Sequence, residues 1–212
     1  MSFSPLEKAR REIEARLDEM YSIIVEMIDY SLERPEETLK RERSVNALEI
    51  DIDELIVQTI ALYHPEASPL REILMALKIN NDLERIGDHA ENVARDVKFF
   101  SEKGEDISDL WDDIALIRDM ARRSFVEAYS SFKNKDASLA KEIWRSDYIV
   151  DALRDKILKR AVDTLPTPVA LKTVSIAQNF ERIADLSTNI AEDVVFIVEG
   201  EIIKHKPLEE IE

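Results

Sequence analysis

The chain has 212 residues, of which 45% are hydrophobic, and it contains no cysteine. Its length suits one substantial core or two small ones, and the lack of cysteine excludes disulfides and thiolate metal sites. The formal net charge of −16 argues against binding to nucleic acid or to an anionic membrane surface. Residues 1–11 do not resemble a signal peptide, and no apolar run approaches the ~20 residues that span a bilayer, so we expect a cytoplasmic protein.

Helix-start signals divide the chain into six segments. Ser4 precedes Pro5, and Glu7 follows three residues after the serine, which is the pattern of a capping box. Further Ser/Thr-Pro starts occur at 68–69 and 167–168. We predict an all-α fold of six long antiparallel helices, at 5–31, 35–63, 69–100, 108–132, 136–162 and 168–199.

Apolar residues recur every three or four positions within these segments, which is the period of a helix with one buried face. The clearest example lies in the second segment, where the predicted core positions are Val45, Leu48, Ile52, Leu55, Thr59 and Leu62.

The third helix of each half contains the same motif. Residues 80–97 read NNDLERIGDHAENVARDV, and residues 177–194 read AQNFERIADLSTNIAEDV. Eight positions are identical at a constant offset, whereas unrelated helical segments share only one or two. We therefore predict two tandem, internally duplicated three-helix bundles, formed by residues 1–103 and 104–212.

Two carboxylates recur at matching positions of this motif. Glu84 and Asp88 are four residues apart, as are Glu181 and Asp185, so each pair occupies one face of its helix. Like charges at this spacing cost about 0.2–0.5 kcal/mol, whereas two adjacent carboxylates are suited to binding a hard cation. The other interpretation is an ordinary solvated face, because these acids lie opposite the apolar positions of the same helix. Both interpretations stay open.

The second helices extend this candidate site. Asp147 and Asp151 are again four residues apart, and the equivalent positions in the first half hold Glu42 and Asn46. Four repeated residues of the third helices are expected to support the site: Asn92 and Asn189 continue the acid stripe, and Arg85 and Arg182 pair with nearby acids.

Catalytic patterns are missing from the sequence. There is no His-Glu-x-x-His, no phosphate-binding glycine loop and no ferritin-like pair of Glu-x-x-His motifs. His89, which follows Asp88, is the one histidine that we keep as a spare ligand. We therefore do not expect an enzyme.

Residues 82–90 (DLERIGDHA) and 180–185 (FERIAD) resemble the repeated acid signature of the PhoU family. The turn from His64-Pro65 to Leu70-Arg71 and the ending from Glu199 to Pro207 are similar to that family as well, so the resemblance covers most of the chain. It implies a negative regulator of phosphate uptake and of phosphate-starvation signalling. Such a protein would dock onto the ATPase subunit of a phosphate ABC transporter or onto a sensor histidine kinase, and the resemblance allows a homodimer.

The resemblance also implies iron or zinc clusters on the bundle surface. The residues that match the ligand pattern are Glu84, Asp88, Glu181, Asp185, Asp147, Asp151 and Glu42. Asn46 stands where a full pattern would have another acid, which weakens the site in the first half. The alternative is a metal-free acidic helical adaptor that binds a basic partner protein.

Overall fold

The computed structural model describes residues 3–146 and 148–200. All the secondary structure of these residues is α-helical, in the elements α1 (Pro5–Tyr30), α2 (Pro35–Tyr63), α3 (Ala67–Lys103), α4 (Ser108–Asn134), α5 (Ala137–Ser146), α6 (Tyr148–Thr164) and α7 (Thr167–Glu199). The predicted all-α fold is thus confirmed. The fifth predicted helix corresponds to α5 and α6, on either side of residue 147, which lies outside the described residues. Within the described ranges, none of the helices is both long and apolar enough to cross a membrane.

Local sequence signals set most of the helix ends. The capping box is confirmed, because Ser4 Oγ accepts from the Glu7 amide at 3.2 Å and the Glu7 carboxylate accepts from the Ser4 amide at 2.8 Å. The two later Ser/Thr-Pro starts are wrong by one or two residues, since Glu66 and Pro166 are the N-cap residues of α3 and α7. Gly104 ends α3 in the left-handed conformation, with φ of 67°, that favours glycine at this position.

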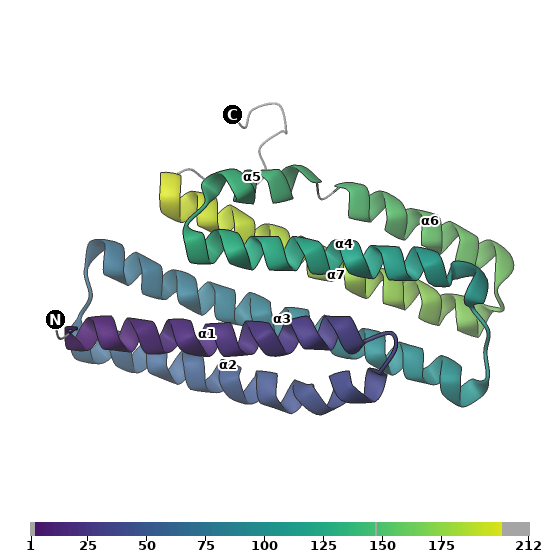
Figure 1. The fold of residues 1–212 in the computed structure, drawn as a ribbon, viewed down its shortest axis with the longest axis horizontal. Coiled ribbons are helices and arrows are strands. Elements are labelled where there is room, and N and C mark those ends of the chain that lie inside the picture. Colours follow the sequence, from purple (N-terminus) through teal and green to yellow (C-terminus); the bar gives the residue numbers. More distant parts are fainter. Residues whose placement is uncertain (1–2, 147, 201–212) are drawn as a thin grey trace.

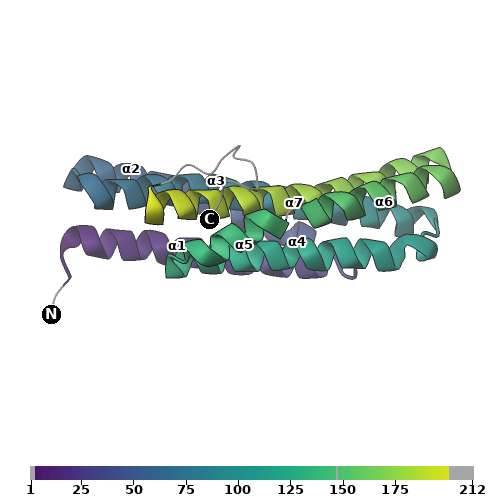
Figure 2. The ribbon, with the colours of Figure 1, turned by 90° about the horizontal axis from the view of Figure 1, so that it is seen from above.

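The helices form two layers (Figures 1 and 2). One layer contains α2, α3, α7 and α6 side by side, and α1 and α4 form the other. The first half of the chain packs as α1, α2 and α3, and the second as α4, α5, α6 and α7. We call the side of the four-helix layer that faces away from α1 and α4 the broad face.

The two halves join where α3 and α7 pack against each other in antiparallel directions. Lys78 Nζ lies 3.0 Å from Asp193 Oδ1, and Lys172 Nζ lies 2.5 Å from Asp96 Oδ1. Asp96 and Asp193 occupy equivalent positions of the repeated motif, whereas the two lysines are about one helix turn out of register in the repeat. With α3 and α7 antiparallel, the junction therefore has only an approximate two-fold axis. His89 lies between them and donates from Nδ1 to Asn179 Oδ1 at 2.9 Å.

A single hydrophobic core runs through both halves. The equivalent positions of the second helices are buried to the same degree, as shown by Val45 with Val150 and by Ile52 with Ile157. The predicted core position Leu62 is wrong, since its side chain is 68% exposed near the end of α2. The helical period continues there, but the neighbouring helix no longer covers that face.

Candidate functional site

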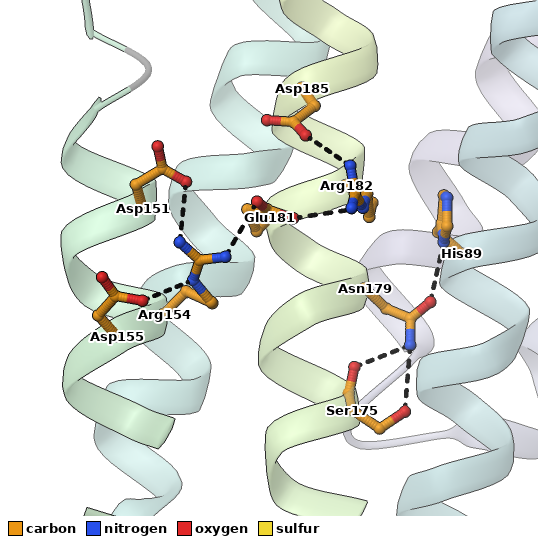
Figure 3. A network of polar contacts seen from close by, with 9 residues as sticks. All are labelled: His89, Asp151, Arg154, Asp155, Ser175, Asn179, Glu181, Arg182 and Asp185. Atoms are coloured by element: carbon orange, nitrogen blue, oxygen red, sulfur yellow. Dashed lines mark hydrogen bonds and ion pairs between the residues drawn. The ribbon is translucent and has the colours of Figure 1, made fainter. Parts of the chain in front are cut away.

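In the C-terminal half, the repeated acids are held by two arginines (Figure 3). Arg154 of α6 places Nη1 3.3 Å from Glu181 Oε1 and Nη2 3.5 Å from Asp151 Oδ1. Arg182 of α7 places Nη1 3.2 Å from Asp185 Oδ2 and Nε 3.6 Å from Glu181 Oε2. The second and third helices of this half are therefore joined by a network of alternating charges.

Burial distinguishes these acids from an ordinary surface pair. Glu181 is only 8% exposed, so the interpretation of an acid on a solvated face is wrong for this residue. Burial raises the pKa of Glu181, and the charge of Asp185 raises it further, against the opposing effect of both arginines. Burial likewise raises the pKa of Asp185, with Arg182 opposing it. The guanidinium groups thus compensate carboxylates that would be costly to keep ionised alone.

In the N-terminal half, the equivalent acids have acidic neighbours. Glu84 and Asp88 are half-buried on α3. Burial raises the pKa of Glu84, and the charges of Asp88 and of Glu49 on α2 raise it further. Burial and the charge of Glu91 raise the pKa of Asp88. The second helix therefore brings an acid, Glu49, near the repeated glutamate in the N-terminal half and an arginine, Arg154, near it in the C-terminal half.

One exchange between the repeats accounts for this difference. Glu49 and Arg154 each lie four residues after equivalent buried valines, Val45 and Val150. Both residues face the glutamate of the third helix, but their charges are opposite. Neither residue was among the predicted site residues, although an alignment of the second helices extended by one turn includes both.

The other predicted site residues are dispersed. Glu42 accepts from Asn46 Nδ2 at 2.5 Å and lies near the charge of Arg95, one helix turn or more beyond the Glu84 pair. Asp147 lies outside the described residues. Asn92 is exposed on α3. In the first half, Glu84 and Asp88 thus lie together on α3, whereas the contacts of Glu42 are with Asn46 and Arg95.

The repeated arginines meet across the junction of the halves. Arg85 of α3 and Arg182 of α7 both line a surface pocket of about 400 Å³, together with Trp144, Thr188 and Asn189. Arg85 Nη1 also lies 3.8 Å from the carboxylate of Asp82, three residues earlier on its own helix. Both arginines thus pair with an acid of a neighbouring turn, as expected, and in addition line the same surface pocket.

The described side chains do not fit a metal cluster as they are arranged. Within residues 3–146 and 148–200, no three acidic or histidine side chains are grouped closely enough to hold one ion. In the C-terminal half, Arg154 and Arg182 already contact both carboxylate oxygens of Glu181 and one oxygen each of Asp151 and Asp185, which a metal would need as ligands. His89, the spare ligand, instead bonds to Asn179 at the junction of the halves.

Comparisons with known proteins agree with the duplicated architecture. The PhoU domain family model matches twice, at residues 7–97 and 114–194. The chain is 33% identical to "Phosphate-specific transport system accessory protein PhoU homolog 1" of Thermotoga maritima, over 82% of this chain and 79% of that protein. It is 32% identical to the PhoU homolog of Aquifex aeolicus, over 96% and 97% of the two chains.

Solved structures show the same fold. The crystal structure of PhoU from Pseudomonas aeruginosa superposes with a TM-score of 0.87 at 27% identity, over 92% of this chain and 99% of that one. The phosphate transport system regulatory protein PhoU from Streptococcus pneumoniae gives a TM-score of 0.84 at 21% identity, which supports the fold alone. The two matches to the family model and the identity over most of the chain show that this protein belongs to the PhoU family.

Proposed function

We propose that this protein is a cytoplasmic regulator of phosphate uptake and phosphate-starvation signalling that works by docking and not by catalysis. Its relatives are named as accessory proteins of a phosphate-specific transport system, so a component of such a system is the partner class that they favour. The partner we propose is the ATPase subunit of a phosphate ABC transporter. A sensor histidine kinase is the second partner that the resemblance to the PhoU family implies.

The observation that carries this proposal is the position of the duplicated acids. α1 and α4 lie on one side of the four-helix layer, opposite the broad face (Figure 2). The repeated acids Glu84 and Asp88 of α3 and Asp185 of α7 are partly exposed. Glu84 and Asp88 are partly desolvated and have acidic neighbours, which raises their pKa values and leaves the ionised forms in need of positive charge. A basic partner surface would supply that charge.

The geometry favours the metal-free form of this regulator. Arginines hold the acids of the C-terminal half, and the described side chains provide no group of three ligands. Docking through charge and shape needs no bound ion. It does require that complementary surfaces meet, which makes affinity sensitive to salt.

The direct test is binding of the purified chain to the ATPase subunit of its own phosphate transporter. We expect an affinity that falls as salt rises and is unchanged by a chelator such as EDTA. Replacing Glu84 and Asp88 by Gln and Asn should weaken binding and shift its salt dependence. A matched control is Glu19→Gln, an exposed acid of α1 in the other layer. Absence of binding, or equal effects of the two changes, would contradict the proposal.

A further inference from the structure

Both halves expose the same two aliphatic residues at equivalent positions. Val57 of α2 and Val162 of α6 are 64% and 63% exposed. Leu74 of α3 and Leu171 of α7 are 46% and 66% exposed. We call Val57 with Leu74 the first apolar pair, and Val162 with Leu171 the second apolar pair. Each pair joins the second and third helices of its half.

A single exposed aliphatic side chain needs no explanation. The duplication is the informative part, because the offsets that align the buried cores also align these exposed positions. Val57 and Val162 follow the buried residues Ile52 and Ile157 by the same five positions. Both positions keep valine, which is a poorer helix former than the charged residues usual on an exposed face. The need for a solvated surface does not explain why both of these exposed positions hold valine.

The two pairs lie at opposite ends of the four-helix layer. Val57 and Leu74 are each about two turns from the connection between α2 and α3, and the second pair lies beside the connection between α6 and α7. These connections are at opposite ends of the molecule (Figure 1). Lys172 forms an ion pair with Asp96, so its neighbour Leu171 lies at the level of Asp96 on α3. The distance between the two pairs is therefore the rise along α3 from Leu74 to Asp96, which is ~33 Å at 1.5 Å per residue.

Further aliphatic residues enlarge each pair along its second helix. Ile50 lies two turns before Val57 on α2 and is 55% exposed, and Leu158 lies one turn before Val162 on α6. These two additions are not at equivalent positions of the repeat. Each end of the layer therefore exposes three aliphatic side chains, the kind of residue that contacts the apolar side of a partner helix.

Charge decides against a second copy of this chain as the occupant. Glu84 and Asp88 are partly exposed on α3 between the levels of the two pairs, and the whole chain carries a net charge of −16. Two such faces would place like charges opposite each other at short range. A partner with basic residues around its apolar contacts would instead neutralise desolvated carboxylates.

We propose that the broad face docks a two-fold-symmetric protein, each of whose two identical subunits places one basic, apolar-tipped segment on one apolar pair. This inference rests on the proposed function, since an ABC-transporter ATPase works as a pair of subunits. The approximate two-fold axis of the duplicated chain would coincide with the axis of the partner. Engagement of both ends at once would provide the gain in affinity of a bivalent contact.

The test compares three variants for binding to the purified ATPase subunit in its paired, ATP-bound state. The first carries Val57→Ser with Leu74→Ser, the second carries Val162→Ser with Leu171→Ser, and the third carries all four changes. Because these side chains are exposed, the variants should keep the wild-type circular dichroism and melting temperature. The matched control is Leu116→Ser, which changes a 50% exposed leucine on α4 in the other layer.

We expect each two-residue variant to bind ~100-fold more weakly, because a bivalent contact becomes monovalent. The two losses should agree within about 5-fold, the four-residue variant should not bind, and the control should bind like the wild type. Loss at only one end would overturn the two-fold arrangement, and wild-type binding by all variants would overturn the docking face while leaving the proposed function intact. No binding by the wild-type chain would instead refute the proposed function, and with it this partner. A dimer of this chain in sedimentation, lost only in the four-residue variant, would also overturn the inference.

Discussion

Replacing Arg154 by methionine is expected to lower the free energy of unfolding by about 2 kcal/mol at pH 7. Arg154 is the link from α6 to Glu181, a carboxylate that is 8% exposed. A hydrogen bond to a charged group contributes about 1.5–3 kcal/mol, and removing one partner of a fully buried pair costs about 3–5 kcal/mol. Arg182 remains 3.6 Å from Glu181 in the variant, which places the expected cost toward the lower of these ranges.

Urea denaturation of a double-mutant cycle measures this contribution. Glu181→Gln alone leaves Arg154 with Asp151 and Asp155, so we expect a cost below about 1 kcal/mol. Arg154→Met combined with Glu181→Gln should be more stable than Arg154→Met alone, because no charge is left without its partner. The resulting coupling energy should be about 1–2 kcal/mol.

The pH dependence provides an independent check. The folded-state pKa of Glu181 is already raised by burial, and it should rise further when Arg154 is removed. A carboxyl with a raised pKa stabilises the fold below its unfolded-state pKa and loses that contribution as pH rises through the folded-state pKa. The cost of Arg154→Met should therefore be largest at neutral pH and shrink on acidification. A cost that does not change with pH, or a cycle without coupling, would refute this reasoning.

Three other changes test different parts of the structure. Glu49→Arg gives the first half the arginine that the second half has at the equivalent position. It should stabilise the fold by about 0.5–1 kcal/mol in urea unfolding at pH 7 and lower the pKa of Glu84, which NMR titration measures. A less stable variant would contradict an ion pair between positions 49 and 84. Ser4→Ala removes the capping box of α1 and should cost about 1 kcal/mol, with Ser4→Gly costing less. Protein purified without chelator should contain less than one iron or zinc per chain, and EDTA should leave its melting temperature unchanged; stoichiometric metal would show that the carboxylates rearrange around an ion.

Much of the fold could be predicted because helix periodicity and helix ends are local properties. The predicted boundaries of α2 match the structure, and Ser4 and Pro35 start their helices as expected. The repeated motif also identified the halves before any packing was known. The errors concern the starts of α3 and α7 and the exposure of Leu62. The N-cap residues of α3 and α7 make no side-chain cap hydrogen bond, so the Ser/Thr-Pro pattern did not mark these starts.

The candidate site was harder to predict, because its properties arise between helices. Spacing correctly placed Glu181 and Asp185 on one side of α7, but it could not show that Arg154 of α6 reaches Glu181. Spacing also suggested that Glu42 belongs with the acids of α3, whereas Glu49 is the α2 residue whose charge acts on Glu84. Which turn of one helix faces which turn of another depends on their relative shift, and no pattern within one helix records that shift.

The two halves agree in their exposed aliphatic residues and differ in their charges, and a symmetric partner reconciles these facts. Val57 and Val162 would supply equal contacts at the two ends, whereas Glu49 and Arg154 give neighbouring sites opposite charges. An asymmetric partner would bind better in one orientation than in the other. A two-fold-symmetric partner looks the same after a half-turn, so its two orientations on this chain are identical. A difference in charge between the two halves therefore does not make one orientation bind worse than the other. With the proposed partner, the charges between the helices could therefore differ between the halves, whereas the aliphatic contacts are needed at both ends.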